Sequence, residues 1–507
     1  MNSRYLTFPV AFLFIFVAIS HHLVQAQPEP GDVFKEYVWS CAMGNPGCNC
    51  GGDTFRVGYR NGAQNPTNPV EFAKNVDVAD ATKAEVILEV SRCHIGTHDL
   101  QVSVNGNGWI KVPLPFDDYE SYAGYYFPVV PVPINQIQAG TNTVSLKVAE
   151  SGGSPWPQLL YSGAHLRVYY DPAAKAHVGG EITAPVSGET IGAPAQIVCT
   201  PGQGSVDRVE FVGHYRGVNW ESDGVYTQWH YVYYHGELSR HIGTVDAAPY
   251  QTQWDTEWIA NQPDGIKLAA RIVAADGTIF MTPAVTVGIC RPGYDVEVCE
   301  ITSCAKAWVT RGGSKSSTFL VEGDVSRIRG AQVTTVTWGD YNPDGLINGV
   351  NVGKLGGGGY TWDFDVIDID ESTAKAAFKQ GENTMTTPGG GHHGAEVMYP
   401  GPMPVVKFSA ANDCDNAQVD ARRTASRARA DEKIRVHCSG GSITFDLRSG
   451  RPAEVSLMRL DGTVVARTRV AANGSGSIDA ARLPNGVYLL TMHDGTAETV
   501  RRISIAR

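Results

Sequence analysis

Short stretches in which apolar and polar residues strictly alternate recur along this chain, and they constrain its fold more than any other feature. The ranges 100–104, 143–148 and 165–170 all alternate in this way. A period of two places one set of side chains on a core and the other in water, as in strands of an antiparallel sheet. The 56 Gly and 28 Pro residues suit turns between strands and are more than long helices tolerate. The sequence therefore predicts an all-β chain.

Length and composition limit the architecture and the class of partner. With 507 residues, the chain is too long for one hydrophobic core and predicts several domains. Hydrophobic residues make up 42% of it and charged residues 18%, which is typical of globular domains. The formal net charge of -11 offers no electrostatic footprint for a polyanion, so we expect no nucleic-acid partner.

The N-terminus has the pattern of a secretory signal. Arg4 precedes an apolar run from Leu6 to Ile19, and small residues at Val24 and Ala26 mark a cleavage site. We therefore expect residues 1–26 to be a signal peptide. A membrane anchor is the alternative, but the run is shorter than the roughly 20 apolar residues that span a bilayer. No other segment qualifies, so we expect no transmembrane span in the mature chain.

The ten cysteines fit an exported protein, because oxidising compartments let disulfides persist. No two of them have the three-residue separation of a C-x-x-C zinc ligand pair, so structural disulfides are favoured over a metal. Up to five bridges are possible, and their connectivity stays open.

Two segments repeat the same landmarks. The stretch "VNGNGWIKV" at 104–112 corresponds to "INGVNVGKL" at 347–355. Likewise, "AGTNT" at 139–143 corresponds to "QGENT" at 380–384. The two landmarks are separated by nearly equal lengths of chain in both segments, which indicates a duplicated fold. Asn-Gly pairs favour tight hairpin turns because both residues tolerate positive φ.

Both segments resemble galactose-binding-like jelly rolls, and we place these modules at 27–175 and 293–410. Between them, at 176–292, "ITAPVSGETI", "VDRVEFVGHY" and "GIKLAARIVAADGTI" resemble a bacterial Ig-like module. The stretch from Arg216 to Arg240 departs from that pattern as a long aromatic insertion. The resemblances imply two jelly-roll β-sandwiches flanking an Ig-like β-sandwich.

The end of the chain forms a unit of its own. A turn at Asp461-Gly462, the stretch "LPNGVYLL" at 483–490 and a closing strand from Val500 to Ile505 follow in order. This progression resembles the C-terminal sorting domain of the type IX secretion system, a small Ig-like β-sandwich, which we place at 441–507 after a linker at 411–440. The resemblance implies recognition by the type IX machinery and a secreted or outer-surface location in a two-membrane bacterium.

Aromatic side chains supply the candidate ligand-binding residues. Stacked aromatic faces and nearby polar groups commonly recognise sugars, and inserted loops on a sandwich often carry binding sites. The alternative is that the aromatic residues pack the insertion onto a neighbouring sandwich. The predicted ligand-binding residues are Trp109, Trp220, Tyr226, Trp229, His230 and Trp362.

One segment resembles the front of a calcium loop. Asp340, Asn342 and Asp344 occupy positions one, three and five, and Gly345 occupies position six. Position twelve is Asn351, which cannot supply the bidentate carboxylate of such a loop. Calcium is therefore one hypothesis for a cofactor, and an Asx-rich loop without an ion is the other.

No recognisable catalytic motif stands out, and the catalytic residues stay unassigned. The sequence favours a non-catalytic protein of the cell surface that binds polysaccharide or glycan, or that acts in adhesion. The alternative is a secreted hydrolase or lyase acting on polysaccharide or glycoprotein, with two carboxylates facing one bond. A purely structural surface protein is a third possibility, favoured if the aromatic insertion is buried between modules.

Overall fold

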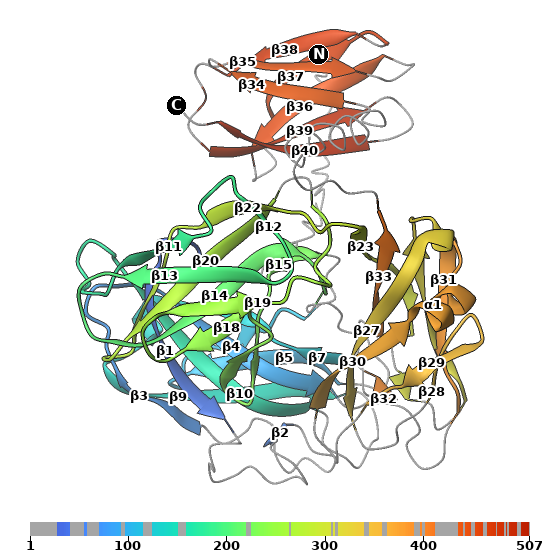
Figure 1. Cartoon of the computed structure of the whole chain (residues 1–507). Coiled ribbons are helices and arrows are strands. Elements are labelled where there is room, and N and C mark those ends of the chain that lie inside the picture. The colour runs from blue at the N-terminus through green and yellow to red at the C-terminus, as the bar shows by residue number, and fades with distance from the viewer. Residues whose placement is uncertain are drawn as a thin grey trace, which may run out of the picture. The chain divides into compact units, whose positions relative to one another are not determined.

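The chain is all-β, as predicted (Figure 1). The computed structural model describes residues 28–40, 55–57, 70–92, 97–114, 124–150, 159–219, 225–262, 265–305, 308–309, 313–338, 344–356, 362–389, 396–397, 401–410, 434–439, 442–447, 452–459, 464–472, 474–480, 483, 486–493 and 498–505. Within these residues, helical structure is limited to α1 (Glu371–Ala377) and the short 3-10 turns η2 (Ile134–Gln136) and η4 (Val325–Arg327). The chain divides into two compact units, Met1–Cys414 and Asp415–Arg507.

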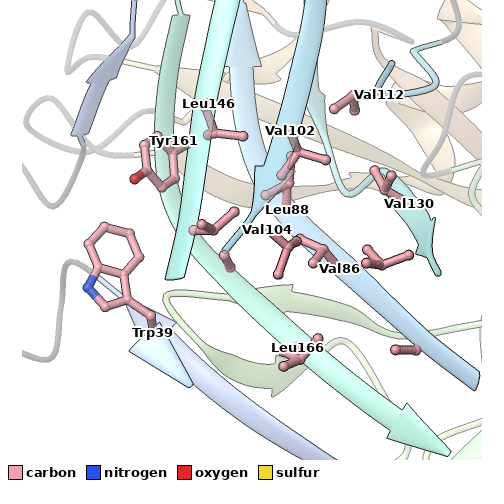
Figure 2. Packing of buried hydrophobic residues seen from close by; sticks show 14 of the residues in the cluster. Trp39, Val86, Leu88, Val102, Val104, Val112, Val130, Leu146, Tyr161 and Leu166 are labelled. Carbon is pink, nitrogen blue, oxygen red and sulfur yellow. The ribbon is translucent and has the colours of Figure 1, made fainter. Parts of the chain in front are cut away.

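The first sandwich of the N-terminal unit has one separate sheet and one that it shares with the next module. The separate sheet contains, in order, β3 (Val70–Val76), β9 (Gly140–Glu150), β5 (Thr97–Val104) and β6 (Ile110–Lys111). The alternating apolar residues of these strands meet those of the shared sheet in one core (Figure 2). Val102 and Leu146 come from the separate sheet, and Leu88 and Leu166 from the shared sheet. The predicted core faces of 100–104 and 143–148 are thus confirmed.

The shared sheet has 13 strands in the described residues. Strand β21 pairs with β20 of the middle module and also with β1, where Val33 lies opposite Phe280. Backbone hydrogen bonds therefore run without a break from the middle module into the first sandwich. The main path contains β12 (Thr190–Ile191), β22 (Val285–Ile289), β20 (Ile266–Ala274), β21 (Thr278–Met281), β1 (Val33–Ser40), β10 (Leu159–Tyr170), β4 (Ala81–Arg92) and β7 (Gly124–Tyr126), and beside it lie β14 (Val206–Arg216), β15 (Thr227–Trp229), β18 (Gly243–Val245), β2 (Phe55–Val57) and β8 (Val129–Val132).

The middle module is a second sandwich, built on the other end of the shared sheet. Its second sheet contains β11 (Gly180–Ala184), β13 (Ala195–Pro201) and β19 (Gln251–Trp254). Ile182 and Ile197 from this sheet pack against Phe211 of β14 and Leu268 of β20. The insertion adds a two-stranded hairpin, β16 (Val232–Tyr234) with β17 (Glu237–Ser239).

The third sandwich of the N-terminal unit consists of two sheets around one core. Phe319 and Met385 of one sheet pack against Val333 and Phe408 of the other. The Asp370 carboxylate accepts a hydrogen bond from the Thr373 backbone amide at 3.0 Å and so caps α1. One sheet contains β23 (Tyr294–Val298), β33 (Met403–Ser409), β27 (Ile328–Trp338), β32 (Glu396–Val397), β25 (Trp308–Val309) and β30 (Trp362–Asp370), and the other β24 (Ile301–Cys304), β26 (Lys315–Val321), β31 (Gly381–Thr387), β28 (Asp344–Ile347) and β29 (Val350–Lys354).

The repeated sequence landmarks form the same hydrogen-bonded clamp in the first and third sandwiches. Asn105 Nδ2 donates to Asn142 Oδ1 at 2.8 Å, and Asn348 Nδ2 donates to Asn383 Oδ1 at the same distance. Asn105 and Asn348 both have positive φ, of 52° and 48°. The second Asn of each pair is fully buried and bonds the backbone of the turn before it. Each clamp therefore ties a hairpin turn to the neighbouring strand, which explains why both landmarks recur together.

The C-terminal unit is a smaller β-sandwich. Its apolar core includes Phe445, Val455, Leu457 and Leu490, which lie on both of its sheets. The strands on either side of the predicted Asp461-Gly462 turn, Ala453–Arg459 and Val464–Val470, pair antiparallel, and the turn itself lies outside the described residues. The sheets contain β34 (Ile434–Ser439), β35 (Ser442–Leu447) and β38 (Ser475–Asp479), and β37 (Val464–Val470), β36 (Ala453–Arg459), β39 (Gly486–His493) and β40 (Glu498–Ile505).

The sequence allows up to five disulfide bridges, and three of the described cysteines are not bridged. Cys199, Cys299 and Cys304 are free thiols, and Cys199 and Cys299 are buried in apolar cores. Fewer than five bridges therefore form. The two buried free thiols fill core positions as small apolar side chains. Cys290 is disulfide-bonded. The predicted signal peptide and most of the predicted linker lie outside the described residues.

Candidate functional site

The shared sheet buries both of its faces. On β10, Leu166 and Val168 point into the first core, whereas Arg167 belongs to the opposite face. The sequence predicted that this opposite face lies in water. That prediction is wrong, because Arg167 and Arg271 of β20 are both only 1% exposed. A segment distant in the sequence covers the face that a single strand would leave to solvent.

The covering segment is the aromatic insertion. Its Trp229, Tyr231 and Tyr233 are buried against side chains from strands of both the first sandwich and the middle module. Large aromatic side chains bury much apolar area, so they are well suited to pack between two modules. The resulting second-face core contains Phe34, Ile87, Val129, Tyr169, Val212, Trp229, Tyr231, Tyr233, Ala269, Val273, Ile279 and Met281.

A network of buried charges lies beside this second-face core. Arg167 of β10 lies opposite Glu36 of β1 and Glu85 of β4 in the strand register. Its Nε donates to Glu36 Oε1 at 2.9 Å, and its Nη1 donates to Glu85 Oε2 at 3.3 Å. Cross-strand neighbours share a face, so three consecutive strands place these charges in one row.

A second row meets the first at Glu36. Arg271 of β20 lies opposite Glu210 of β14, and its Nε is 3.2 Å from Glu210 Oε2. Arg271 Nη2 also donates to Glu36 Oε2 at 2.7 Å, and the Tyr233 hydroxyl donates to Glu36 Oε1 at 2.5 Å. Burial alone would raise the pKa of Glu36, but the charges of Arg271 and Arg167 hold it well below its usual range. Glu36 is therefore a fixed carboxylate that joins both modules to the insertion.

A cavity of about 570 Å³ opens over this charge network. The pairing of β1 with β21 ends at Lys35 and Thr278, so Glu36 and Val38 have no β21 partner on that side. The missing partner leaves the space, which has the size of small-molecule sites, about 300–1,000 Å³. The cavity is lined by Glu36, Val38, His165, Arg208, Glu210, Tyr233, Gly236, Glu237, Leu238, Thr244, Arg271, Val273, Gly277 and Ile279.

The floor and the rim of the cavity differ in exposure. Glu36, Arg271 and Tyr233 form a buried floor whose polar groups bind one another. Glu237 and Thr244 are exposed at the rim, and the Arg208 side chain is partly exposed there. Burial lowers the pKa of His165 to about 4, so this lining residue is neutral at pH 7. The site therefore combines a rigid, charge-paired floor with an accessible polar rim.

A separate buried carboxyl, Glu89 of β4, fixes the turn of the insertion. Its Oε1 accepts hydrogen bonds from the Tyr125 hydroxyl and from the His235 backbone amide, the latter at 3.1 Å. Glu89 is 0% exposed, and this burial raises its pKa to about 7 although the hydrogen bond from Tyr125 opposes the shift. Glu89 is not among the residues that line the cavity.

The raised pKa of Glu89 predicts a pH dependence of stability. The unfolded carboxyl titrates near 4.5, so its contribution to stability is complete below that pH and is lost as pH rises through about 7. We expect the wild-type chain to lose about 3 kcal/mol over this window relative to Glu89→Gln, which does not titrate. Urea unfolding of both proteins between pH 4.5 and 8 measures the difference. Parallel curves for the two proteins would contradict the assignment.

Two of the predicted ligand-binding residues belong to the core. Trp229 is 5% exposed and His230 is 3% exposed, and the His230 ring stacks on Tyr215 at 4.0 Å between ring centroids. His230 Nε2 donates to the Tyr215 carbonyl at 2.8 Å, and burial lowers its pKa to about 4. These contacts favour the packing alternative for Trp229 and His230.

The other predicted ligand-binding residues are dispersed. Tyr226 is half-buried, and its hydroxyl accepts a hydrogen bond from the Ile301 backbone amide at 2.9 Å. Trp109 is half-buried, with Lys147 Nζ 4.5 Å from its ring centroid. Trp362 belongs to β30, and Trp220 lies outside the described residues. The described members of the set do not converge on one site.

Of the predicted calcium ligands, Asp344 lies within the described residues. Lys354 Nζ lies 2.5 Å from its carboxylate and lowers its pKa. Asp344 and Asn351 belong to the paired strands β28 and β29, so this stretch is a hairpin and not a loop between helices. Asp340 and Asn342 lie outside the described residues, and the part of the chain that is described holds no group of three or more His, Cys, Asp or Glu suited to a metal. Calcium binding stays a prediction.

Sequence reasoning did not identify the cavity residues. A signal for them exists, because Glu210, Arg271 and Arg167 interrupt strands whose neighbours are apolar on both sides. A charge in such a run indicates either a solvated face or a buried pair, and only the fold distinguishes the two. Glu237 and Thr244 carry no comparable signal.

Comparison with known families identifies the end of the chain. Residues 439–506 match the family described as secretion system C-terminal sorting domain. The C-terminal unit is a type IX secretion sorting domain. The sorting domain implies recognition by that machinery and export to the medium or the cell surface. The apolar core of the C-terminal unit, around Val455 and Leu457, thus belongs to an export module.

Outside the sorting domain, the comparisons give little. No curated protein matches the chain. A β-glucuronidase from Ruminococcus gnavus aligns at 14% identity and a TM-score of 0.14, covering 40% of this chain and 37% of the enzyme. The Lactobacillus rhamnosus β-glucuronidase aligns at 13% identity and a TM-score of 0.16, covering 43% and 45%. The matches span less than half of either enzyme.

None of the helices in the described residues combines the length and apolar character needed to cross a membrane.

Proposed function

We propose that the N-terminal unit is a non-catalytic glycan-binding and adhesion protein, displayed on the outer surface of a two-membrane bacterium by its sorting domain. The observation that carries this proposal is the cavity of about 570 Å³ over the charge-paired floor. Its volume suits a small polar ligand such as a sugar ring. The side chains at its accessible rim can form hydrogen bonds with sugar hydroxyls.

The titration of the lining residues suits binding better than catalysis. A general acid works best with a pKa near the working pH. Glu36 has a lowered pKa and His165 one of about 4, so both stay in one protonation state at neutral pH. Glu89, whose pKa is about 7, is fully buried and is not among the residues that line the cavity. A secreted enzyme acting on polysaccharide or glycoprotein is the competing proposal.

The burial of the insertion favours a further candidate, a structural surface or adhesion protein without a sugar ligand. Trp229, Tyr231 and Tyr233 hold the first two sandwiches together, which would make the unit a stiff spacer. Its cavity would then hold only solvent.

A glycan array with the full-length exported chain separates these proposals. We expect retention of a defined set of glycans without release of reducing ends from them. Release of product would establish the enzyme, and absence of any retained glycan would contradict the binding proposal and leave the structural one.

A further inference from the structure

The charged groups on the floor of the cavity are paired with one another, and Arg271 Nε and Glu210 Oε2 form an ion pair at 3.2 Å without a hydrogen bond. The Glu36 carboxylate accepts hydrogen bonds from Arg167, Arg271 and Tyr233, at 2.9, 2.7 and 2.5 Å. Glu210 is bound by Arg208 Nε at 2.7 Å and by Arg271. An ionic ligand would have to compete with these internal pairs, and breaking buried pairs is costly.

The rim, by contrast, offers both a donor and an acceptor. Arg208 uses Nε and Nη1 for Glu210 and Asp207, and its Nη2 has no partner among the described residues. The exposed Glu237 carboxylate likewise binds no described side chain or backbone group. Thr244 lies opposite Glu210 in the strand register, so its side chain shares that face at the mouth of the cavity.

The charges that surround the cavity compensate one another. Glu36, Glu210 and Glu237 face Arg208 and Arg271 in the lining, and Arg167 supplies the third cation through its bond to Glu36. Val38, Leu238 and Ile279 add aliphatic surface to the same walls. A sugar ring presents hydroxyls that donate and accept, together with C–H faces, and it carries no charge unless it bears a carboxylate, sulfate or amine.

We propose that this cavity binds one neutral sugar residue of a glycan, with Arg208 and Glu237 as the groups that contact its hydroxyls. The inference rests on the proposed glycan-binding function and adds the position of the site and the class of sugar. We expect the exposed Glu237 carboxylate at the rim to disfavour acidic sugars by like-charge repulsion.

The test uses substitutions at the mouth of the cavity and leaves the buried charged residues of its floor unchanged. Thr244→Trp places a large side chain at an exposed strand position, and Thr183→Trp is the matched control, at an exposed threonine of β11 on the middle module's other sheet. Glu237→Ala removes one proposed contact. Titration calorimetry uses the full-length chain and the glycan retained most strongly on the array.

We expect Thr244→Trp and Glu237→Ala to weaken binding at least about tenfold, with unchanged melting temperature, and Thr183→Trp to bind as the wild type. We also expect neutral glycans to be retained in preference to sialylated, sulfated or uronic-acid glycans. Wild-type binding that survives both cavity variants would overturn this inference and leave the glycan-binding function in place. Retention of acidic glycans alone would overturn the neutral class, and a wild-type chain that retains no glycan would overturn both proposals.

Discussion

Replacement of Arg271 by leucine is expected to lower the free energy of unfolding of the N-terminal unit by about 3–5 kcal/mol. Arg271 is 1% exposed and binds both Glu36 and Glu210. Its removal leaves two carboxylates in a low-dielectric interior with fewer compensating charges, which costs far more than the pair itself contributes. Urea unfolding followed by tryptophan fluorescence measures the loss.

The matched control for Arg271→Leu is Arg329→Leu. Arg329 Nη1 lies 3.3 Å from Glu371 Oε2, but both side chains are exposed. Exposed ion pairs contribute about 0–1 kcal/mol, so this variant should unfold almost as the wild type does. Equal losses in both variants would show that the network of Glu36, Glu210 and Arg271 is not the buried junction described above.

Replacement of Trp229 by alanine is expected to cost about 3–5 kcal/mol, because it opens a cavity in the second-face core. Trp229 packs there with residues from both the first sandwich and the middle module. Trp229→Phe, which keeps an aromatic ring, should recover a large part of this loss. Thermal and urea unfolding of the two variants and the wild type give the comparison.

The same variants separate packing from ligand recognition. Trp109→Ala is the control, since Trp109 is a half-buried aromatic residue on the first sandwich. We expect it to unfold at nearly the wild-type urea concentration, and Trp229→Phe to bind glycan with unchanged affinity. Loss of glycan binding by Trp229→Phe at wild-type stability would restore Trp229 as a ligand-binding residue.

The local pattern of the sequence predicts much of the fold. The alternation at 100–104 and 143–148 identifies strands and their core faces, because a period of two fixes which side chains share a face. The repeated Asn-Gly and Gly-x-Asn landmarks predict the duplicated sandwich, since each pair of landmarks builds one clamp from residues about 35 positions apart. These features depend on contacts that each segment makes within its own module.

The cavity could not be predicted from the sequence because it depends on contacts between different modules. An antiparallel sheet can leave one face in water, so the strand that contains Arg167 does not by itself distinguish a covered second face from a solvated one. Its cover, Tyr233, comes from a hairpin of another module, at Val232–Tyr234. The sequence indicates that the insertion at 216–240 is rich in aromatic residues, but a sequence alone does not distinguish an aromatic cluster that binds sugar from one that joins two modules.

The most direct test of the account is a crystal structure of the exported chain with the glycan that it retains. We predict density for one neutral sugar ring in the cavity over Glu36, within hydrogen-bonding distance of Arg208 and Glu237. Density for the sugar at another place on the N-terminal unit, with the cavity holding only water, would contradict it.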